Sequence, residues 1–133
     1  MEAVLVTHGE LGFSLKKTLE GLIGPQEGFF VFSNSGLGIT QMKENLKELV
    51  DKTNSKEGIF VFVDLFGGSC WQAAKFSSLG KPKVALFSGV SLPMLISFFS
   101  KRGNLNFQEL FETVKQGGEK GAKSEYTNAD SPL

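Results

Sequence analysis

Residues 59–69 read Ile-Phe-Val-Phe-Val-Asp-Leu-Phe-Gly-Gly-Ser. Five successive apolar residues without alternation are typical of a strand that is covered on both faces, as in a parallel sheet. The acid, the two glycines and the serine that follow are typical of a turn that leads into a helix. The segment therefore predicts a buried parallel strand at residues 59–63, which ends in a loop at Asp64.

The same kind of short apolar run occurs elsewhere in the chain, at residues 3–6, 29–32 and 84–87. Amphipathic or apolar helical patterns follow these runs, and we expect helices at residues 11–22, 39–49, 69–78, 92–100 and 106–116. Alternation of strands and helices predicts an α/β fold, with an open, doubly wound and mainly parallel sheet and helices on both faces.

Length and composition restrict the class of protein. The 133 residues, 41% of them hydrophobic, suit one globular domain, which we place at residues 1–120 before a polar tail at residues 121–133. Lys+Arg and Asp+Glu are both 14, so no excess of basic charge points to nucleic acid. The single cysteine and the lack of a signal-peptide pattern predict a cytoplasmic protein without a disulfide.

Functional side chains are expected in the loops beyond the carboxyl ends of the strands. His8, the only histidine, directly follows the first strand, and Asp64 follows the third. If these strands are neighbours, Asp64 can accept a hydrogen bond from one ring nitrogen of His8 and leave the other nitrogen with a free lone pair. The alternatives are a structural or solvated histidine and an aspartate that caps a loop.

Two glycine-rich turns at the starts of helices offer backbone N–H groups to an anion. One is Gly67-Gly68-Ser69 and the other is Gly36-Leu37-Gly38. Either turn alone is a weak signal, because such turns are common between strands and helices. Together with a nucleophilic histidine, they point to a transiently bound phosphoryl group.

Other chemistries fit the sequence less well. Ser69 lacks the Gly-x-Ser-x-Gly pattern of a nucleophile elbow, and neither a P-loop nor a dinucleotide-binding pattern is present. His8 and Cys70 are far apart in the sequence, so we expect neither a zinc site nor any other metal or cofactor. We expect Cys70 to be a small core residue, with a redox-sensitive thiol as the less favoured alternative.

Three motifs, in order, carry a resemblance to a known family: Leu5-Val-Thr-His-Gly9, Val63-Asp-Leu-Phe-Gly-Gly-Ser69 and Gly89-Val-Ser-Leu-Pro-Met-Leu95. They resemble the mannose-family IIA component of the bacterial phosphoenolpyruvate-dependent sugar phosphotransferase system, from residue 1 to about residue 115. The resemblance implies a central parallel sheet in the order 2-1-3-4. It also implies an added antiparallel edge strand that is exchanged across a homodimer.

The same resemblance implies the roles of the site residues and the partners. His8 would accept a phosphoryl group from phospho-HPr, on the nitrogen that Asp64 does not contact, and pass it to a IIB component. Asp64 would orient the ring, and Ser69, Gly68 and Gly36 would line the phosphate pocket. No metal or cofactor is implied, and a membrane permease would be reached only indirectly.

Two other functions remain open at this point. The chain could be a regulator that binds its target according to its phosphorylation state, or a non-catalytic flavodoxin-like binding module. The residues themselves also favour a homodimer, because residues 92–99 are apolar around most of the helix. Segment 122–126 is a candidate for pairing with a sheet edge.

Overall fold

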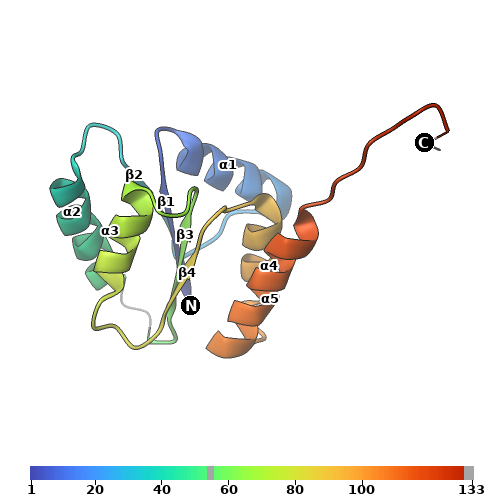
Figure 1. Ribbon diagram of the computed structural model, residues 1–133. Helices are drawn as coiled ribbons and strands as arrows, with labels where there is room; N and C mark the ends of the chain where they lie inside the picture. Colours follow the sequence, from blue (N-terminus) through green and yellow to red (C-terminus); the bar gives the residue numbers. More distant parts are fainter. Residues whose placement is uncertain (54–55, 131–133) are drawn as a thin grey trace.

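The computed structural model describes residues 1–53 and 56–130, so residues 131–133 of the predicted tail lie outside the described ranges. The elements, in order, are β1 (Glu2–Thr7), α1 (Leu11–Ile23), β2 (Phe29–Ser33), α2 (Ile39–Lys52), β3 (Ile59–Val63), α3 (Ser69–Ser78), β4 (Val84–Phe87), α4 (Leu92–Lys101) and α5 (Phe107–Gly121). All neighbouring strands pair in parallel, in the order β2-β1-β3-β4 (Figure 1). The predicted fold class and strand order are confirmed.

The two central strands are buried along almost their whole length. In β1 and β3, only Glu2 is not fully buried. The outer strands β2 and β4 are also apolar, but only part of each is buried. An edge strand has a neighbour on one side only, so the expectation that all four strands are fully covered is wrong for β2 and β4.

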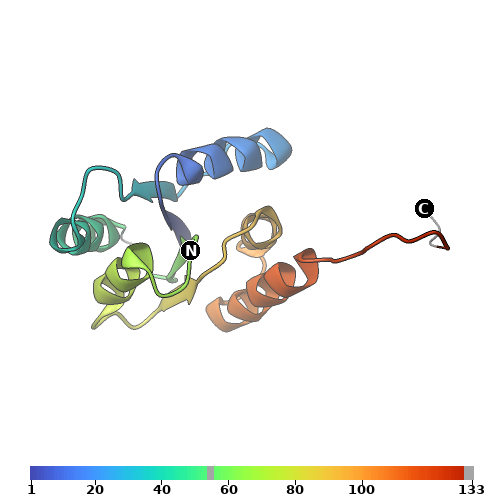
Figure 2. The ribbon, with the colours of Figure 1, turned by 45° about the horizontal axis from the view of Figure 1, so that its top comes forward.

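Helices cover both faces of the sheet (Figure 2), and each face has its own hydrophobic core. Under α1, α4 and α5 the core is rich in phenylalanine, and the ring of Phe60 lies 4.9 Å from that of Phe98 and 5.8 Å from that of Phe87. Under α2 and α3 the core consists of smaller side chains such as Val61 and Ala74. The small side chains let α3 pack closely on β1 and β3.

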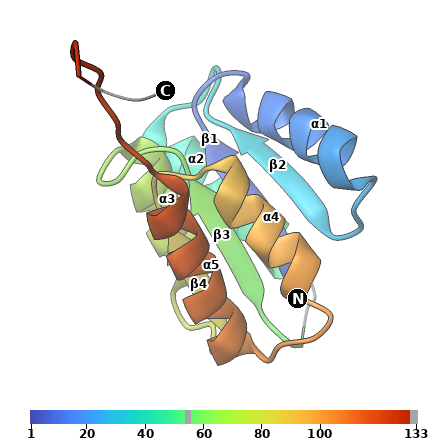
Figure 3. The ribbon, with the colours of Figure 1, turned by 90° about the vertical axis from the view of Figure 1, so that its right-hand side faces the viewer.

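Helix α5 begins as expected but extends further than expected. Asn106 caps it, and Asn106 and Glu109 form the predicted capping box. The helix continues to Gly121, whereas the sequence predicted an end near Gln116. The reason is tertiary packing, because α5 lies along α4 (Figure 3). A Cβ at Gly121 would lie only 2.7 Å from Cβ of Pro93.

The apolar side chains of helix α4 are buried or partly buried within the chain. Leu95, Phe98 and Phe99 are buried in the phenylalanine-rich core, and Met94 packs beneath α5. The apolar character of this helix therefore does not by itself require a partner, because α5 supplies much of the cover that the sequence analysis assigned to one, and the homodimer stays a prediction. A dimer would have to rest on other grounds.

We predict that alanine has opposite effects at two helical glycines. Gly21→Ala in α1 should raise the free energy of unfolding by about 0.5–1 kcal/mol, because no atom lies within 4 Å of the new Cβ. Gly117→Ala in α5 should lower it by about 1–3 kcal/mol, because the new Cβ would lie 3.1 Å from Cβ of Ser97 and crowd its hydroxyl. Urea denaturation checks both; equal stabilisation would mean that α5 does not pack closely on α4.

Residues 122–130 leave the body of the protein as an extended segment without regular secondary structure (Figure 1). Segment 122–126 pairs with no strand of its own chain, and the outer edge of β4 carries no further strand among the described residues. In the described part of the chain, no helix has both the length and the apolar character needed to cross a membrane.

Candidate functional site

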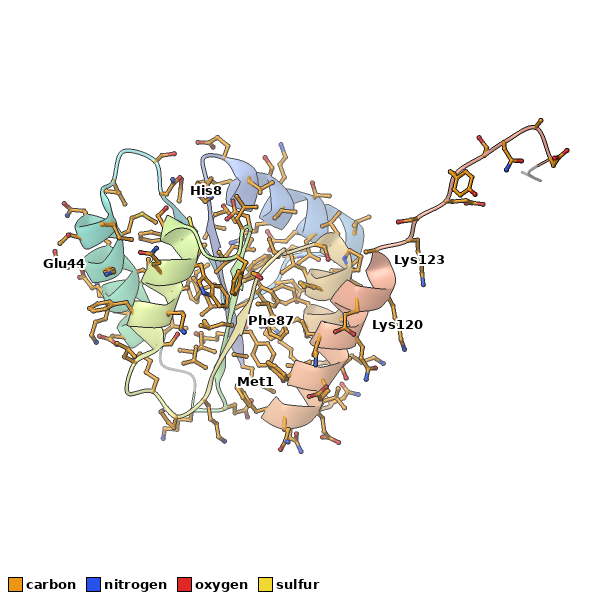
Figure 4. All side chains as sticks on the ribbon, in the orientation of Figure 1. Met1, His8, Glu44, Phe87, Lys120 and Lys123 are labelled. Carbon is orange, nitrogen blue, oxygen red and sulfur yellow. The ribbon has the colours of Figure 1, made fainter. Side chains whose placement is uncertain are left out.

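The site lies at the carboxyl ends of β1 and β3, where the sheet places His8 beside Asp64. Val6 pairs with Val63, so the residues that follow these two strands emerge next to each other. His8 Nδ1 lies 2.9 Å from Oδ2 and 3.1 Å from Oδ1 of Asp64. Figure 4 shows His8 at the end of the sheet opposite Met1. The predicted contact between the two side chains is therefore present.

The carboxylate of Asp64 is held by backbone groups as well as by the ring. Its oxygens accept hydrogen bonds from the backbone N–H of His8, at 2.9 Å, and from that of Leu65, at 3.0 Å. A carboxylate held in this way accepts a hydrogen bond from Nδ1–H and so favours the tautomer with a free lone pair on Nε2. The His8 side chain is 40% exposed and that of Asp64 only 9%, so the ring stands between a fixed acid and solvent.

The loop that carries His8 is fastened to the end of β2. Asn34 Oδ1 accepts from the backbone N–H of Gly9 at 3.0 Å, and the hydroxyl of Ser33 donates to the carbonyl of Gly9 at 2.7 Å. The buried hydroxyl of Thr7 accepts from the backbone N–H of Gly12 at the start of α1. Sequence analysis did not assign Ser33 and Asn34 a role, although the polar run that ends the second strand was a usable signal.

The start of α3 presents backbone N–H groups at the same end of the sheet. Gly68 is the N-cap and has no side chain to bind the first N–H groups of the helix, which starts at Ser69. Gly67 precedes them with φ +82°, a conformation that favours glycine. This end of α3 can therefore bind an anion.

Gly36 lies in the turn between β2 and α2, with φ +74°, two residues before the N-cap Gly38. It is at the correct end of the sheet for the predicted pocket. Among the described residues, however, the side chains in polar contact with the ring of His8 are those of Asp64 and Cys70. The assignments of Gly36, Gly68 and Ser69 to a phosphate pocket remain predictions.

Cys70 is buried beside His8, with Sγ 3.7 Å from Nδ1. The premise that the cysteine and the histidine are far apart is thus wrong in space, because the start of α3 folds back against the end of β1. Burial, and next the negative charge of Asp64, raise the pKa of the Cys70 thiol to about 11. The prediction of a small core residue is confirmed, and the raised pKa argues against a readily oxidised thiol.

Cys70 should accordingly be slow to react. At pH 8 the raised pKa leaves the native protein with about 100-fold less thiolate than a thiol with the usual pKa of 9.0. We expect iodoacetamide to modify the folded protein at least about 100-fold more slowly than the urea-unfolded chain, with the native rate rising about tenfold from pH 8 to pH 9. Equal rates at pH 8 would contradict the burial of the thiol.

The surroundings of His8 are open and partly apolar. Leu65 and Phe66, which follow Asp64, are 61% and 75% exposed, and the ring of Phe66 lies 5.0 Å from that of Trp71.

A cavity of about 200 Å³ at the opposite end of the sheet is lined by residues that include Thr53, Lys81 and Lys83. We place the functional site at His8 rather than at this cavity, because the hydrogen bond that the histidine ring donates to Asp64 prepares the ring to act as a nucleophile.

Comparisons of the sequence and of the structure with known proteins all point to IIA components of the phosphotransferase system. The family described as EIIA-man, PTS system fructose IIA component, matches residues 2–115. The mannose-specific EIIAB component of the phosphotransferase system of Escherichia coli K12 is 30% identical over 129 residues, which cover 91% of this chain and 38% of that protein. The fructose-specific EIIA component of Bacillus subtilis 168 is 22% identical over 116 residues, or 86% of this chain and 80% of that protein.

Among solved structures, the phosphotransferase system component EIIA from Streptococcus agalactiae superposes with a TM-score of 0.83. The two sequences are 22% identical, and the superposition covers 92% of this chain and 95% of the other. This likeness confirms the fold. The match over residues 2–115 shows the family: the chain belongs to the EIIA-man family, the fructose and mannose type IIA components of the sugar phosphotransferase system.

Proposed function

We propose that this protein is a phosphocarrier of sugar uptake, which accepts a phosphoryl group from phospho-HPr on Nε2 of His8 and passes it to a IIB component. The observation that carries the proposal is the pairing of His8 Nδ1 with the carboxylate of Asp64. This pairing leaves Nε2 as the nucleophilic nitrogen, on a ring that is 40% exposed and therefore accessible to another protein. In this proposal the protein acts in the cytoplasm, and a membrane permease is involved only through IIB.

The reaction is an exchange of one N–P bond for another. The lone pair of Nε2 attacks phosphorus in line, and the bond to the donor histidine breaks as the new bond forms. No proton has to leave Nε2, because the Nδ1–H tautomer already provides the lone pair. The phosphorylated ring carries substituents on both nitrogens and gains positive charge, which the carboxylate of Asp64 stabilises at 2.9 Å.

We propose that the N–H groups at the start of α3, at Gly68 and Ser69, bind the phosphoryl oxygens, together with the turn at Gly36. The absence of a side-chain cap at Gly68 supports this, because the N–H groups of the first turn then need another acceptor. Fixed donors of this kind stabilise the charge on the oxygens during transfer without rearrangement.

The direct test is transfer of labelled phosphate. Phosphoenolpyruvate, enzyme I and HPr should label the protein with one phosphoryl group per chain, and a cognate IIB domain should then remove the label. A non-catalytic binding module would take no label at all. Labelling that no IIB domain can remove would instead indicate a regulator that is switched by phosphorylation.

We also propose that the protein forms a homodimer in which residues 122–126 of each chain add an antiparallel strand to the edge of β4 of the other. The extended course of this segment away from its own sheet supports the proposal, as does the unpaired edge. Sedimentation at micromolar concentration should give a dimer for the full chain and a monomer after truncation at Gly121. A monomeric full chain would contradict the exchange.

A further inference from the structure

We propose that His8 Nδ1, a carboxylate oxygen of Asp64 and Sγ of Cys70 form a binding site for a thiophilic divalent cation such as Zn²⁺, and that metal binding and phosphorylation of His8 exclude each other. The first half of this inference stands on the geometry of the three side chains. The second half also rests on the proposed function.

The ligand atoms are already close to the arrangement that zinc requires. Nδ1 of His8 lies 2.9 Å from Asp64 Oδ2 and 3.7 Å from Cys70 Sγ, and all three ligand atoms lie within 4.8 Å of one another. Tetrahedral zinc, with bonds of about 2.0–2.3 Å, needs ligand atoms roughly 3.3–3.7 Å apart. The nitrogen–sulfur separation already fits, and the nitrogen–oxygen separation has to increase by only a few tenths of an ångström. The carboxylate oxygen and the sulfur, which lie within 4.8 Å of each other, have to approach by up to about 1 Å, a movement within the reach of a side-chain rotation.

The chemistry of the three ligands also fits a soft divalent ion. Imidazole, thiolate and carboxylate are the usual ligands of zinc, and three protein ligands leave the fourth position to a water molecule. Cys70 is fully buried and the side chain of Asp64 nearly so, whereas His8 faces solvent on the side where the water would bind. The neutral thiol loses one proton to water as it binds the ion. The cation then neutralises the two negative groups that would otherwise repel each other.

Metal binding reverses the tautomer of His8. A neutral imidazole that binds a cation through Nδ1 carries its proton on Nε2, and so has no lone pair there to attack phosphorus. In the phosphorylated state, conversely, Nδ1 keeps its proton, which it donates in a hydrogen bond to Asp64, and so has no lone pair for a metal. One ring therefore holds either the ion or the phosphoryl group, although the two occupy different nitrogens.

The metal site can be tested without phosphorylation, by titration with Co²⁺ in place of Zn²⁺. Cys70 is the only cysteine, so the cobalt–thiolate absorption band reports this site alone. We expect one ion per wild-type chain, displaced by Zn²⁺, and binding at least about 100-fold weaker for Cys70→Ser and for His8→Gln. Because the His8 side chain is 40% exposed, the His8→Gln variant should fold normally. Circular dichroism checks that it does.

Glu48→Gln is the matched control, because this carboxylate on α2 contacts Lys52 rather than the site and should leave cobalt binding unchanged. Absence of the thiolate band at saturating cobalt in the wild-type protein would overturn the inference. Cobalt affinity of Cys70→Ser equal to that of the wild-type chain would overturn it as well.

Competition is tested with phospho-HPr that has been formed beforehand and freed of enzyme I. For each protein, the initial rate of phosphoryl labelling in the presence of zinc is divided by the rate for the same protein in the absence of zinc. At a zinc concentration well above the dissociation constant, the ratio should fall at least about tenfold for the wild-type chain and stay near one for Cys70→Ser. The phosphorylated wild-type protein should show no cobalt–thiolate band.

Equal slowing of both proteins by zinc would overturn the competition and place the effect on HPr. A wild-type chain that takes no label even without zinc would overturn the competition together with the proposed function. The metal site itself would still be decided by the cobalt titration, so the two failures are distinguishable.

Discussion

His8→Ala should accept no phosphoryl group from phospho-HPr, whereas the wild-type chain should accept one. The reason is chemical: His8 is the only histidine of the chain, and its Nε2 is the nucleophile that the pairing with Asp64 leaves free. The stability of the protein should change little, because the His8 side chain is 40% exposed. Labelling with radioactive phosphoenolpyruvate in the presence of enzyme I and HPr measures the effect directly.

The chemical behaviour of the label provides a second check on this result. A phosphoramidate on histidine should be lost in acid and survive in alkali, in contrast to a phosphate ester on serine. Ser14→Ala, at an exposed position of α1, should be labelled like the wild-type chain. Undiminished labelling of His8→Ala, or an acid-stable label on Ser69, would rule out His8 as the acceptor.

Asp64→Asn should slow transfer from phospho-HPr by at least roughly 10², while the fold stays intact. An asparagine can present its amide N–H to the ring and so favour the tautomer without a lone pair on Nε2, and it cannot stabilise the positive ring during transfer. Replacing the aspartate that orients a catalytic histidine costs about 10⁴ in turnover in a serine protease. We expect a smaller loss here, because no second proton transfer is needed.

The control for this substitution is Asp51→Asn, which makes the same chemical change at a carboxylate far from His8. Hydrogen bonds from Lys81 and then Lys47 hold the pKa of Asp51 below its usual value, so this aspartate does form ion pairs, but on the surface of α2. Its transfer rate should equal that of the wild-type chain. If Asp64→Asn lowered the thermal stability but transferred at the normal rate, Asp64 would be a loop cap and not a residue that positions His8.

The central part of the fold could be predicted from the sequence because local patterns and tertiary structure agree there. The continuous apolar run at residues 59–63 is a fully buried strand, and α3 spans the predicted residues 69–78. The approach of His8 to Asp64 was predictable for the same reason. Both residues end strands, and parallel strands that are neighbours end at the same edge of the sheet.

Features that depend on packing between distant segments were not predictable. Glycine is a poor helix former, so Gly117, Gly118 and Gly121 suggested the end of a helix; only the proximity of α4 shows that small residues are required there. Cys70 is separated from His8 by 62 residues. No periodic pattern reveals that the second residue of α3 lies against the end of β1.

The hydrogen bonds of Asp64 to both the backbone and the ring of His8 have a consequence for assembly of the protein. The pairing of β1 with β3 is what sets the protonation pattern of the imidazole. A fragment that ends before β3 would contain the nucleophile but would lack the acid that selects its reactive form. Because this is the central and most deeply buried strand pair, the reactive form of His8 should persist until the sheet itself comes apart, and the ring nitrogen resonances of His8 should report the integrity of the sheet.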